Sequence, residues 1–337
     1  MQPLNTDRVA AAMSRAIALA YQGPRSSNPR VGCVIIDAEG VEVGAGFHHG
    51  AGTPHAEVEA LAVAGAKALG ATAVVTLEPC RHTGRTGPCT EALINAGISR
   101  VVFAQHDPTL EAAGGAEVLR QAGIDVLEGV GQADAEQVNV AWTHVQATGL
   151  PYVLLKLAQT LDARVADADG GPTAISGPQA RLLTHQLRSQ SDAVLVGIGT
   201  AIADDPQLTV REIDVRMQPL RVVMGERELP AGLRLHDDSA QTLLIGNRDP
   251  KDALRLLADR GIQQVLLEGG PTLASAFLEA GCVNEVVWII APTLMGAGVP
   301  SSHPLTRPFP VDVIQVAMIG NDVMVRGRIS RSASSQR

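Results

Sequence analysis

Three metal-binding side chains that lie far apart in the sequence constrain the fold of this chain more than any other feature. His55 stands where a helix is expected to begin, Cys80 follows an apolar run, and Cys89 follows a loop rich in glycine and proline. Two thiolates and one imidazole suit Zn²⁺, and three protein ligands leave the fourth tetrahedral position for water. The sequence therefore predicts a catalytic zinc site at which the three segments meet.

Glu57 lies two residues after His55 and is the predicted proton shuttle of this site. Zinc lowers the pKa of bound water from about 15.7 to about 7, and deamination needs a carboxylate that accepts the water proton and protonates the leaving ammonia. The H-x-E and P-C-x-x-C pattern is typical of zinc nucleobase deaminases. Here eight residues separate Cys80 from Cys89, so the loop is longer and carries His82 and Arg85. The pattern predicts an amino-hydrolase.

Length and pattern predict two α/β domains. The chain has 337 residues, more than an average single domain, and apolar runs typical of strands alternate with helix-period segments. We expect helices over 7–22, 57–68, 133–147 and 178–190, the last capped by Ser176. Gly149 and Pro151 mark the boundary. The predicted organisation is a deaminase domain over 1–149, a second domain over 150–330 and a disordered tail over 331–337.

Composition excludes several classes of partner. The net charge of −8, the absence of a Lys/Arg-rich stripe and an aromatic content of 2% argue against nucleic acid as the main partner. No apolar run approaches the roughly 18 residues of a membrane span. Four cysteines without an export signal favour the cytoplasm, and Cys33 and Cys282 are expected to be small core residues. A homo-oligomer is a weak expectation.

The second half carries two glycine-rich turns after predicted strands. They begin at Gly197 and at Glu268, and backbone amides at such turns can hold phosphates, although for each turn alone an ordinary strand-to-helix connection is the favoured interpretation. Lys156 and Arg188 are candidate phosphate or ribose contacts, or else paired charges. Spacing alone predicts an α/β domain for this half, with a phosphorylated or dinucleotide molecule as the candidate ligand.

Several longer motifs add a resemblance that covers almost the whole chain. They include NPRVGCVII from Asn28, TLEPCRHTGRTGPC, KLAQTLDARVA, LRSQSDAVLVGIGTAIADDPQLTVR and LLEGGPTLASAFL. Together they closely resemble the bifunctional deaminase/reductase of riboflavin biosynthesis. The resemblance implies an N-terminal cytidine-deaminase-like three-layer domain and a C-terminal α/β domain similar in fold to dihydrofolate reductase.

The resemblance also implies two successive reactions. The first domain would deaminate 2,5-diamino-6-(5-phosphoribosylamino)pyrimidin-4-one, and the second would use NADPH to reduce the ribosyl group to ribityl, giving 5-amino-6-(5-phosphoribitylamino)uracil. By motif position the zinc ligands are His55, Cys80 and Cys89, and the proton donor is Glu57. Implied contacts to the deaminase substrate are Asn28, His48, His82 and Arg85. Implied contacts to the reductase substrate are Arg188, Leu208, Arg211 and Glu268. The implied NADPH contacts are Ala158, Thr200, Asp204, Gly270, Pro271 and Thr272, to which we add Lys156.

The chain departs from the family pattern at a few positions. Ser26-Ser27 replaces His-Pro before Asn28, Ala163 replaces a glycine, Ala174 replaces a tryptophan, and Gly225-Glu226 replaces Asp-Ser. Glu226 adds a negative charge where an anionic cofactor would lie, and Arg227 beside it can compensate.

Two alternatives remain open at this point. The chain could be a nucleobase or nucleoside deaminase whose second domain is a degenerate or differently specific reductase, and failure to bind NADPH would favour this. It could instead be a binding module with a structural zinc. Glu57 argues against the second alternative, because a structural site has no use for a carboxylate beside the ligand.

Overall fold

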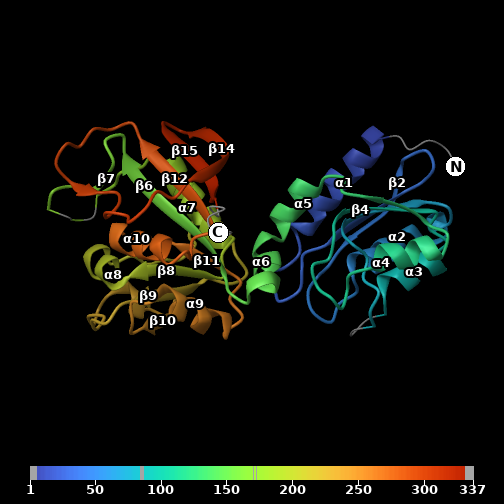
Figure 1. Ribbon diagram of the computed structural model, residues 1–337, viewed down its shortest axis with the longest axis horizontal. Helices are drawn as coiled ribbons and strands as arrows, with labels where there is room; N and C mark the ends of the chain where they lie inside the picture. Colours follow the sequence, from blue (N-terminus) through green and yellow to red (C-terminus); the bar gives the residue numbers. More distant parts are fainter. Residues whose placement is uncertain (1–5, 84–86, 170, 172, 331–337) are drawn as a thin grey trace, which may run out of the picture. The chain divides into compact units, whose positions relative to one another are not determined.

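The computed structural model describes residues 6–83, 87–169, 171 and 173–330, and the chain divides between Thr148 and Gly149 into two compact units (Figure 1). Each unit has its own main sheet and its own hydrophobic core. The predicted disordered tail over 331–337 and the loop residue Arg85 lie outside the described residues.

The N-terminal unit is built on a five-stranded sheet with the order β2-β1-β3-β4-β5. Strand β1 is antiparallel to both β2 and β3, whereas β3, β4 and β5 run parallel. The parallel strands end at the same edge, which is where β3 delivers the segment that contains Cys80. The bounds are β1 (Gly32–Ile36), β2 (Glu42–Phe47), β3 (Thr72–Leu77), β4 (Arg100–Gln105) and β5 (Asp125–Glu128).

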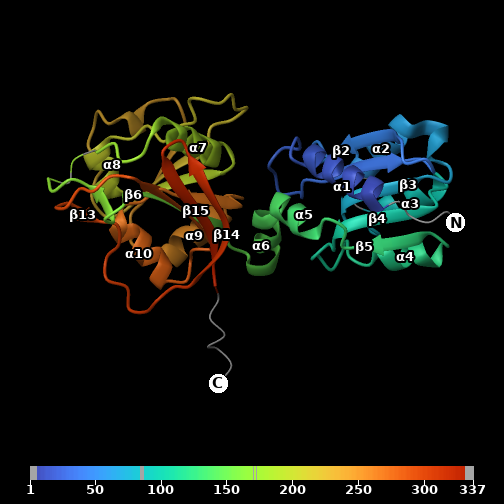
Figure 2. The same ribbon diagram turned by 90° about the horizontal axis from the view of Figure 1, so that it is seen from above.

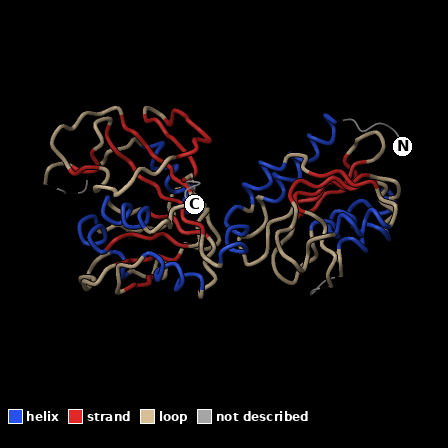
Figure 3. Tube along the Cα trace, viewed as in Figure 1, coloured by secondary structure: helices blue, strands red, loops and turns tan. Residues whose placement is uncertain are grey.

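Helices cover both faces of this sheet (Figure 3). Alternate residues of β1 point in opposite directions, so Cys33 and Ile35 pack against one set of helices and Val34 and Ile36 against the other. The three-layer prediction is therefore confirmed, and Cys33 is a core residue as expected. The first face carries α2 (Ala56–Ala64), η1 (Gly65–Ala68), α3 (Cys89–Asn95) and α4 (Gly115–Gln121), and the second carries α1 (Thr6–Ala20) and α5 (Gln132–Val138).

The prediction of a single helix over 133–147 is wrong, because this region forms two helices, α5 and α6 (Val140–Thr148), which are separated at Asn139. The buried Asn139 side chain accepts a hydrogen bond from the backbone N–H of Arg30 at 2.9 Å and donates one to the Arg30 carbonyl at 2.9 Å. This paired contact with a segment 109 residues away replaces the local helical pattern at that point.

The C-terminal unit contains an eight-stranded sheet with the order β10-β9-β8-β11-β6-β12-β15-β14. The six strands from β10 to β12 are parallel, and β15 and β14 form an antiparallel hairpin at one edge. The bounds are β6 (Tyr152–Thr160), β8 (Ala193–Gly197), β9 (Leu220–Met224), β10 (Thr242–Ile245), β11 (Gln264–Leu267), β12 (Glu285–Ala291), β14 (Val311–Ile319) and β15 (Asp322–Ile329); β7 (Arg164–Ala166) and β13 (Val299–Pro300) form a separate pair.

Helices on opposite faces bury both sides of the central parallel strands (Figure 2). Val153 and Leu155 of β6 pack toward α9 (Pro250–Ala258) and α10 (Pro271–Glu279), and Leu154 packs toward α7 (Pro178–Ser189) and α8 (Ile198–Asp204). Burial on both faces explains why these strands read as continuous apolar runs. A short 3₁₀ helix, η2 (Arg234–His236), lies between β9 and β10, and Cys282 is buried in the core. In the described part of the chain, no helix has the length and apolarity required to cross a bilayer.

The predicted cap of α7 needs correction. The N-cap residue is Gly177 and not Ser176, and its backbone N–H donates to Asp322 Oδ2 at 2.8 Å. A carboxylate from the β15 hairpin therefore holds the segment that leads into α7, and Pro178 occupies the first helical turn.

Ala163 occupies a backbone conformation that favours glycine, with φ of 60°. We predict that Ala163→Gly stabilises the C-terminal unit by about 0.5–1 kcal/mol, because it removes left-handed strain at a small cost in unfolded-state entropy. Urea unfolding would measure the change. The control Ala166→Gly, in β7 and without positive φ, should destabilise the unit, and equal effects of the two substitutions would contradict the prediction.

Candidate functional site

The three predicted zinc ligands meet at one point in the N-terminal unit. Within the described residues, His55, Cys80 and Cys89 form a group whose ligand atoms all lie within 4.8 Å of one another. His55 Nδ1 is 3.1 Å from Cys89 Sγ and 3.5 Å from Cys80 Sγ. Tetrahedral Zn²⁺, with bonds of about 2.0 Å to nitrogen and about 2.3 Å to sulfur, separates such donors by about 3.5 Å. The residues therefore fit a zinc ion.

Local structure explains how these ligands are presented. His55 is the N-cap residue of α2, Cys89 is the first residue of α3, and Cys80 follows the end of β3. The positive end of the α3 dipole favours the thiolate of Cys89. The Cys89 backbone N–H lies 3.4 Å from Cys80 Sγ, and hydrogen bonding from Cys89 lowers the pKa of Cys80 to about 4. The same hydrogen bond and burial raise the pKa of Cys89, so the two sulfurs share one proton and Cys80 is the sulfur that is favoured as the anion.

Glu57 lies in the first turn of α2 and is only 3% exposed. Burial raises the pKa of this carboxyl to about 6, and the neighbouring Cys80 adds to the increase. A carboxyl that titrates near neutral pH can both accept and donate a proton. The site therefore combines three metal ligands with one proton carrier.

Asn28 and His48 lie next to the metal ligands. The ring of His48 is 5.3 Å from the ring of His55, measured between centroids, and its Nε2 is 3.1 Å from Asn28 Nδ2. His48 Nδ1 lies 3.2 Å from the Pro54 carbonyl, which can only accept. Burial lowers the pKa of His48, so the neutral ring donates through Nδ1 and accepts from Asn28 through Nε2. This orientation leaves the second amide hydrogen and the oxygen of Asn28 for other contacts.

His82 follows Cys80 in the long loop and has an unusual environment. Its Nδ1 atom is buried, and no partner for it occurs among the residues that the structure describes. Buried polar atoms are nearly always paired, so this nitrogen is available to a ligand or to a group outside the described residues. Arg85, predicted from the same loop, lies outside the described residues.

In the C-terminal unit, Arg188 and Glu268 form a buried bidentate ion pair. Arg188 Nε and Nη2 donate to the two Glu268 oxygens at 2.6 and 2.9 Å, and Nη1 donates to the Thr209 carbonyl at 3.0 Å. Burial opposes the charge on Glu268, but Arg188 lowers the pKa of this carboxyl below its ordinary value. Burial lowers the pKa of the nearby Lys156, and the charge of Glu268 opposes that shift. Lys156 and Arg188 thus flank one carboxylate.

The two glycine-rich turns lie close together, as a shared ligand site requires. Gly197 precedes α8 and Gly270 precedes α10, and a Cβ atom built on Gly270 would lie 3.4 Å from Thr200 Oγ1. Pro271 and Thr272 begin α10, and Thr272 Oγ1 is 2.8 Å from Nε2 of His303. His303 escaped the sequence prediction, because it lies 31 residues away in a loop without a motif.

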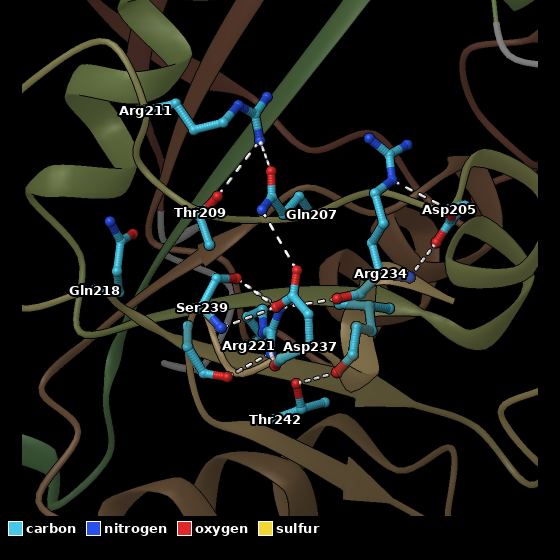
Figure 4. A network of polar contacts seen from close by, with 12 residues as sticks. Asp205, Gln207, Thr209, Arg211, Gln218, Arg221, Arg234, Asp237, Ser239 and Thr242 are labelled. Atoms are coloured by element: carbon cyan, nitrogen blue, oxygen red, sulfur yellow. Dashed lines mark hydrogen bonds and ion pairs between the residues drawn. The ribbon is translucent and has the colours of Figure 1, made fainter. Parts of the chain in front are cut away.

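Arg211 is oriented by a network of polar side chains (Figure 4). Its Nη1 donates to Gln207 Oε1 at 3.2 Å, and Gln207 Nε2 donates to Asp237 Oδ2 at 3.4 Å. Asp237 accepts in turn from Arg221, which is 1% exposed, at 2.8 Å. The network connects the exposed Arg211 to a buried arginine of β9.

Other predicted residues of this unit have less distinctive surroundings. Leu208 has φ of 56°, and its side chain is 2% exposed in the core, so only its main chain can contact a ligand. Ala158 lies near the carboxyl end of β6, and Asp204 is the last residue of α8. Ala174, at the position of the expected tryptophan, is exposed.

Both units match known families. Residues 6–105 match the cytidine and deoxycytidylate deaminase zinc-binding region, and residues 151–325 match the RibD C-terminal domain. The riboflavin biosynthesis protein RibD of Mycobacterium tuberculosis is 48% identical over 86% of each chain. That of Escherichia coli is 43% identical over 85% of this chain and 88% of its own length.

Solved structures agree with these matches over the whole chain. RibD of Acinetobacter baumannii has a TM-score of 0.84 at 38% identity and covers 97% of this chain and 100% of its own. A diaminohydroxyphosphoribosylaminopyrimidine deaminase/5-amino-6-(5-phosphoribosylamino)uracil reductase from Thermotoga maritima has a TM-score of 0.88 at 31% identity, with the same coverage.

The fold and its sites therefore define a zinc-binding deaminase domain joined to a reductase domain. More particularly, the chain belongs to the family of the riboflavin biosynthesis protein RibD, and it is a bifunctional deaminase and reductase of that pathway. The predicted fold class and the predicted enzyme class are both confirmed.

The ion pair between Arg188 and Glu268 makes the stability of the C-terminal unit depend on pH. We predict that Arg188→Met destabilises this unit by about 3 kcal/mol at neutral pH, because Glu268 is left buried without its partner. The pKa of Glu268 is lowered by folding, so the contribution of the pair is complete above the unfolded value of about 4.3 and is lost as the pH falls through the folded value.

In the variant, burial is opposed only by the weaker effects of Lys156 and His185, so the pKa of Glu268 rises. The difference between wild type and variant should therefore shrink as the pH falls from about 7 to about 4, which urea unfolding at several pH values would measure. Arg181→Met, at an exposed position of the same helix, is the matched control. A deficit that does not change with pH would contradict this account.

Proposed function

We propose that the N-terminal unit hydrolyses the 2-amino group of 2,5-diamino-6-(5-phosphoribosylamino)pyrimidin-4-one, and that the C-terminal unit then reduces the ribosyl group of the product with NADPH. The product would be 5-amino-6-(5-phosphoribitylamino)uracil. The observation that carries the first half is the convergence of three zinc-type ligands beside a buried carboxyl. The name of the Thermotoga maritima relative supports the substrate class.

In the deaminase half, bound zinc would supply the Lewis acidity that makes a water molecule nucleophilic at neutral pH. Glu57 accepts one proton from the attacking water and delivers protons to the exocyclic nitrogen, so that water and the amine yield a carbonyl and ammonia. Asn28, His48, His82 and Arg85 are the proposed contacts to the phosphoribosylated substrate. The orphan Nδ1 of His82 and the free hydrogen-bonding capacity of Asn28 support this assignment.

In the reductase half, a bound nicotinamide cofactor would supply the hydride that the sugar carbon receives, so the unit needs no nucleophile of its own. Its residues bind and orient. The carboxyl ends of parallel strands are the usual ligand-binding edge of such sheets. The cofactor would lie along Lys156, Ala158, Thr200, Asp204 and the turn from Gly270 to Thr272, and the sugar phosphate would be held by Arg188, Leu208, Arg211 and Glu268.

The decisive experiment supplies the diaminopyrimidine substrate to the zinc-loaded protein with and without NADPH. We expect ammonia release in both cases and NADPH oxidation that depends on prior deamination. In Glu57→Gln, zinc should remain bound while ammonia release falls by at least about a hundredfold, because the proton carrier is lost. Zinc content by metal analysis and ammonia by a coupled assay measure these two outcomes.

The reductase of the same Glu57→Gln chain, supplied with the deaminated intermediate, serves as the control and should keep wild-type activity. Undiminished ammonia release would remove Glu57 from the mechanism. Ammonia release by the wild type without any NADPH oxidation would favour a deaminase joined to a degenerate reductase.

The preference for NADPH is proposed from the charges at the ends of β9 and β10. Glu226 carries a negative charge that a 2′-phosphate would meet, but the guanidinium of Arg248 lies 3.3 Å from it and offsets part of that charge. Arg227 extends toward α8, where its Nη2 would lie 3.4 Å from a Cβ built on Gly199. A guanidinium beside this turn is the type of group that binds a ribose 2′-phosphate.

We predict that Arg227→Ala raises the Kd for NADPH about tenfold, the loss of one charge-assisted contact worth about 1.4 kcal/mol, and changes the Kd for NADH less than about twofold. Nicotinamide fluorescence titration measures both constants. Arg255→Ala, which removes an exposed arginine of α9 paired with Asp252, is the matched control. Equal weakening of both cofactors would place Arg227 away from the 2′-phosphate.

A further inference from the structure

Glu78 is a buried carboxylate directly before Pro79-Cys80, and the deamination scheme above gives it no role. It is 4% exposed. Its Oε1 accepts backbone hydrogen bonds from Gly114 at 3.1 Å and Ala116 at 3.0 Å, and its Oε2 accepts one from Asp107 at 3.4 Å. One carboxylate thus holds three backbone N–H groups of the loop after β4 and the first turn of α4.

Two of these N–H groups belong to the N-terminus of α4. The N-cap residue Gly114 has φ of 90° and no side chain with which to cap the helix. Glu78 supplies the missing cap from 36 residues away, and its negative charge is favourable at the positive end of the helix. The position of α4 is therefore tied to the residue that leads into the metal ligand Cys80.

The segment held by Glu78 lies against the metal ligands. A Cβ atom on Gly115 would lie 1.8 Å from the Pro79 carbonyl oxygen, so the chain approaches that peptide as closely as its backbone allows. Ala112 forms one buried cluster with Cys80 and Cys89. Ala112 therefore packs on the two cysteine ligands, and Gly115 packs on the peptide that joins Pro79 to Cys80.

We propose that Glu78 is a positioning residue of the zinc site: it holds residues 112–116 against Cys80 and Cys89 and thereby fixes the orientation of the two sulfur ligands. This inference rests on the proposed zinc-dependent deamination. Groups that orient metal ligands typically change metal affinity or activity by about 10- to 100-fold when they are removed. The effect of Glu78 reaches the reaction through the ligands, because its own contacts are to backbone N–H groups and to His106.

The test is Glu78→Gln in the full chain, with cobalt(II) in place of zinc. Glutamine can keep an acceptor oxygen toward Gly114 and Ala116, but its amide then meets the N–H of Asp107 with a second donor. We expect a shift in the visible absorption of the thiolate-bound cobalt and a fall of about 10- to 100-fold in the kcat for ammonia release. The KM should change less than about threefold, because Glu78 does not touch the substrate.

Glu128→Gln is the matched control. Glu128 contacts the same His106, at 3.0 Å, and Arg120 in the last turn of α4, but no N–H of the 107–116 segment. Its variant leaves the N-terminus of α4 held by Glu78 and should keep the wild-type cobalt spectrum and kcat. Reductase activity of each chain, and thermal unfolding, verify that the rest of the protein is intact.

Gly115→Ala tests the same contact without changing Glu78, since the added methyl group must displace the segment from Pro79. Gly115→Ala should shift the cobalt spectrum as Glu78→Gln does. If Glu78→Gln does not fold, the cobalt spectrum of Gly115→Ala tests whether the segment positions the sulfur ligands. A folded Glu78→Gln chain with the wild-type spectrum and kcat would overturn the inference about Glu78 and leave the proposed deamination unaffected. A wild-type chain that releases no ammonia would instead overturn the proposed deamination, while the cobalt comparison would still report on the role of Glu78.

Discussion

The meeting of one imidazole and two thiol sulfurs at a single point is the constraint on which the N-terminal unit depends. His55 and Cys89 stand at the beginnings of two helices, and Cys80 stands just beyond the end of a strand. Donor atoms within 4.8 Å of one another are possible only if α2, α3 and β3 keep their relative positions, which their packing in one core provides. Zinc binding and folding are therefore coupled in this unit.

The two units solve different chemical problems with different means. The deaminase half needs a nucleophile and a proton carrier, so it concentrates titratable groups around a metal position. The reductase half needs orientation, because on the proposed mechanism a bound cofactor would supply the hydride. Its most elaborate feature is accordingly a set of fixed charges, in which Arg188 and Glu268 hold each other and the network of Gln207 and Asp237 directs Arg211.

The sequence identifies local features of this protein well and long-range contacts poorly. The ligand motif and the glycine-rich turns were predictable, because their chemistry is confined to a few consecutive residues. The sequence does not predict the break at Asn139, because that break depends on a contact with Arg30. It does not predict the N-cap of α7 either, because the capping segment is held by Asp322. The hairpin of β14 and β15 went unpredicted although Gly320 marks its turn, with φ of 63°. Glu78 and His303 could not be singled out from the sequence, because the residues that they contact are distant in the chain. The roles of the individual site residues remain predictions.

The division between Thr148 and Gly149 has a genetic consequence. Every candidate residue of the deaminase site comes from the first unit, and every candidate residue of the reductase site comes from the second. A lesion confined to one core leaves the other half with all of its own machinery. On the proposed reaction sequence, two defective alleles, one damaged in each half, would complement each other in the same cell if the deaminated intermediate passes from one chain to another, so that a single reading frame would behave in a cross as two genes.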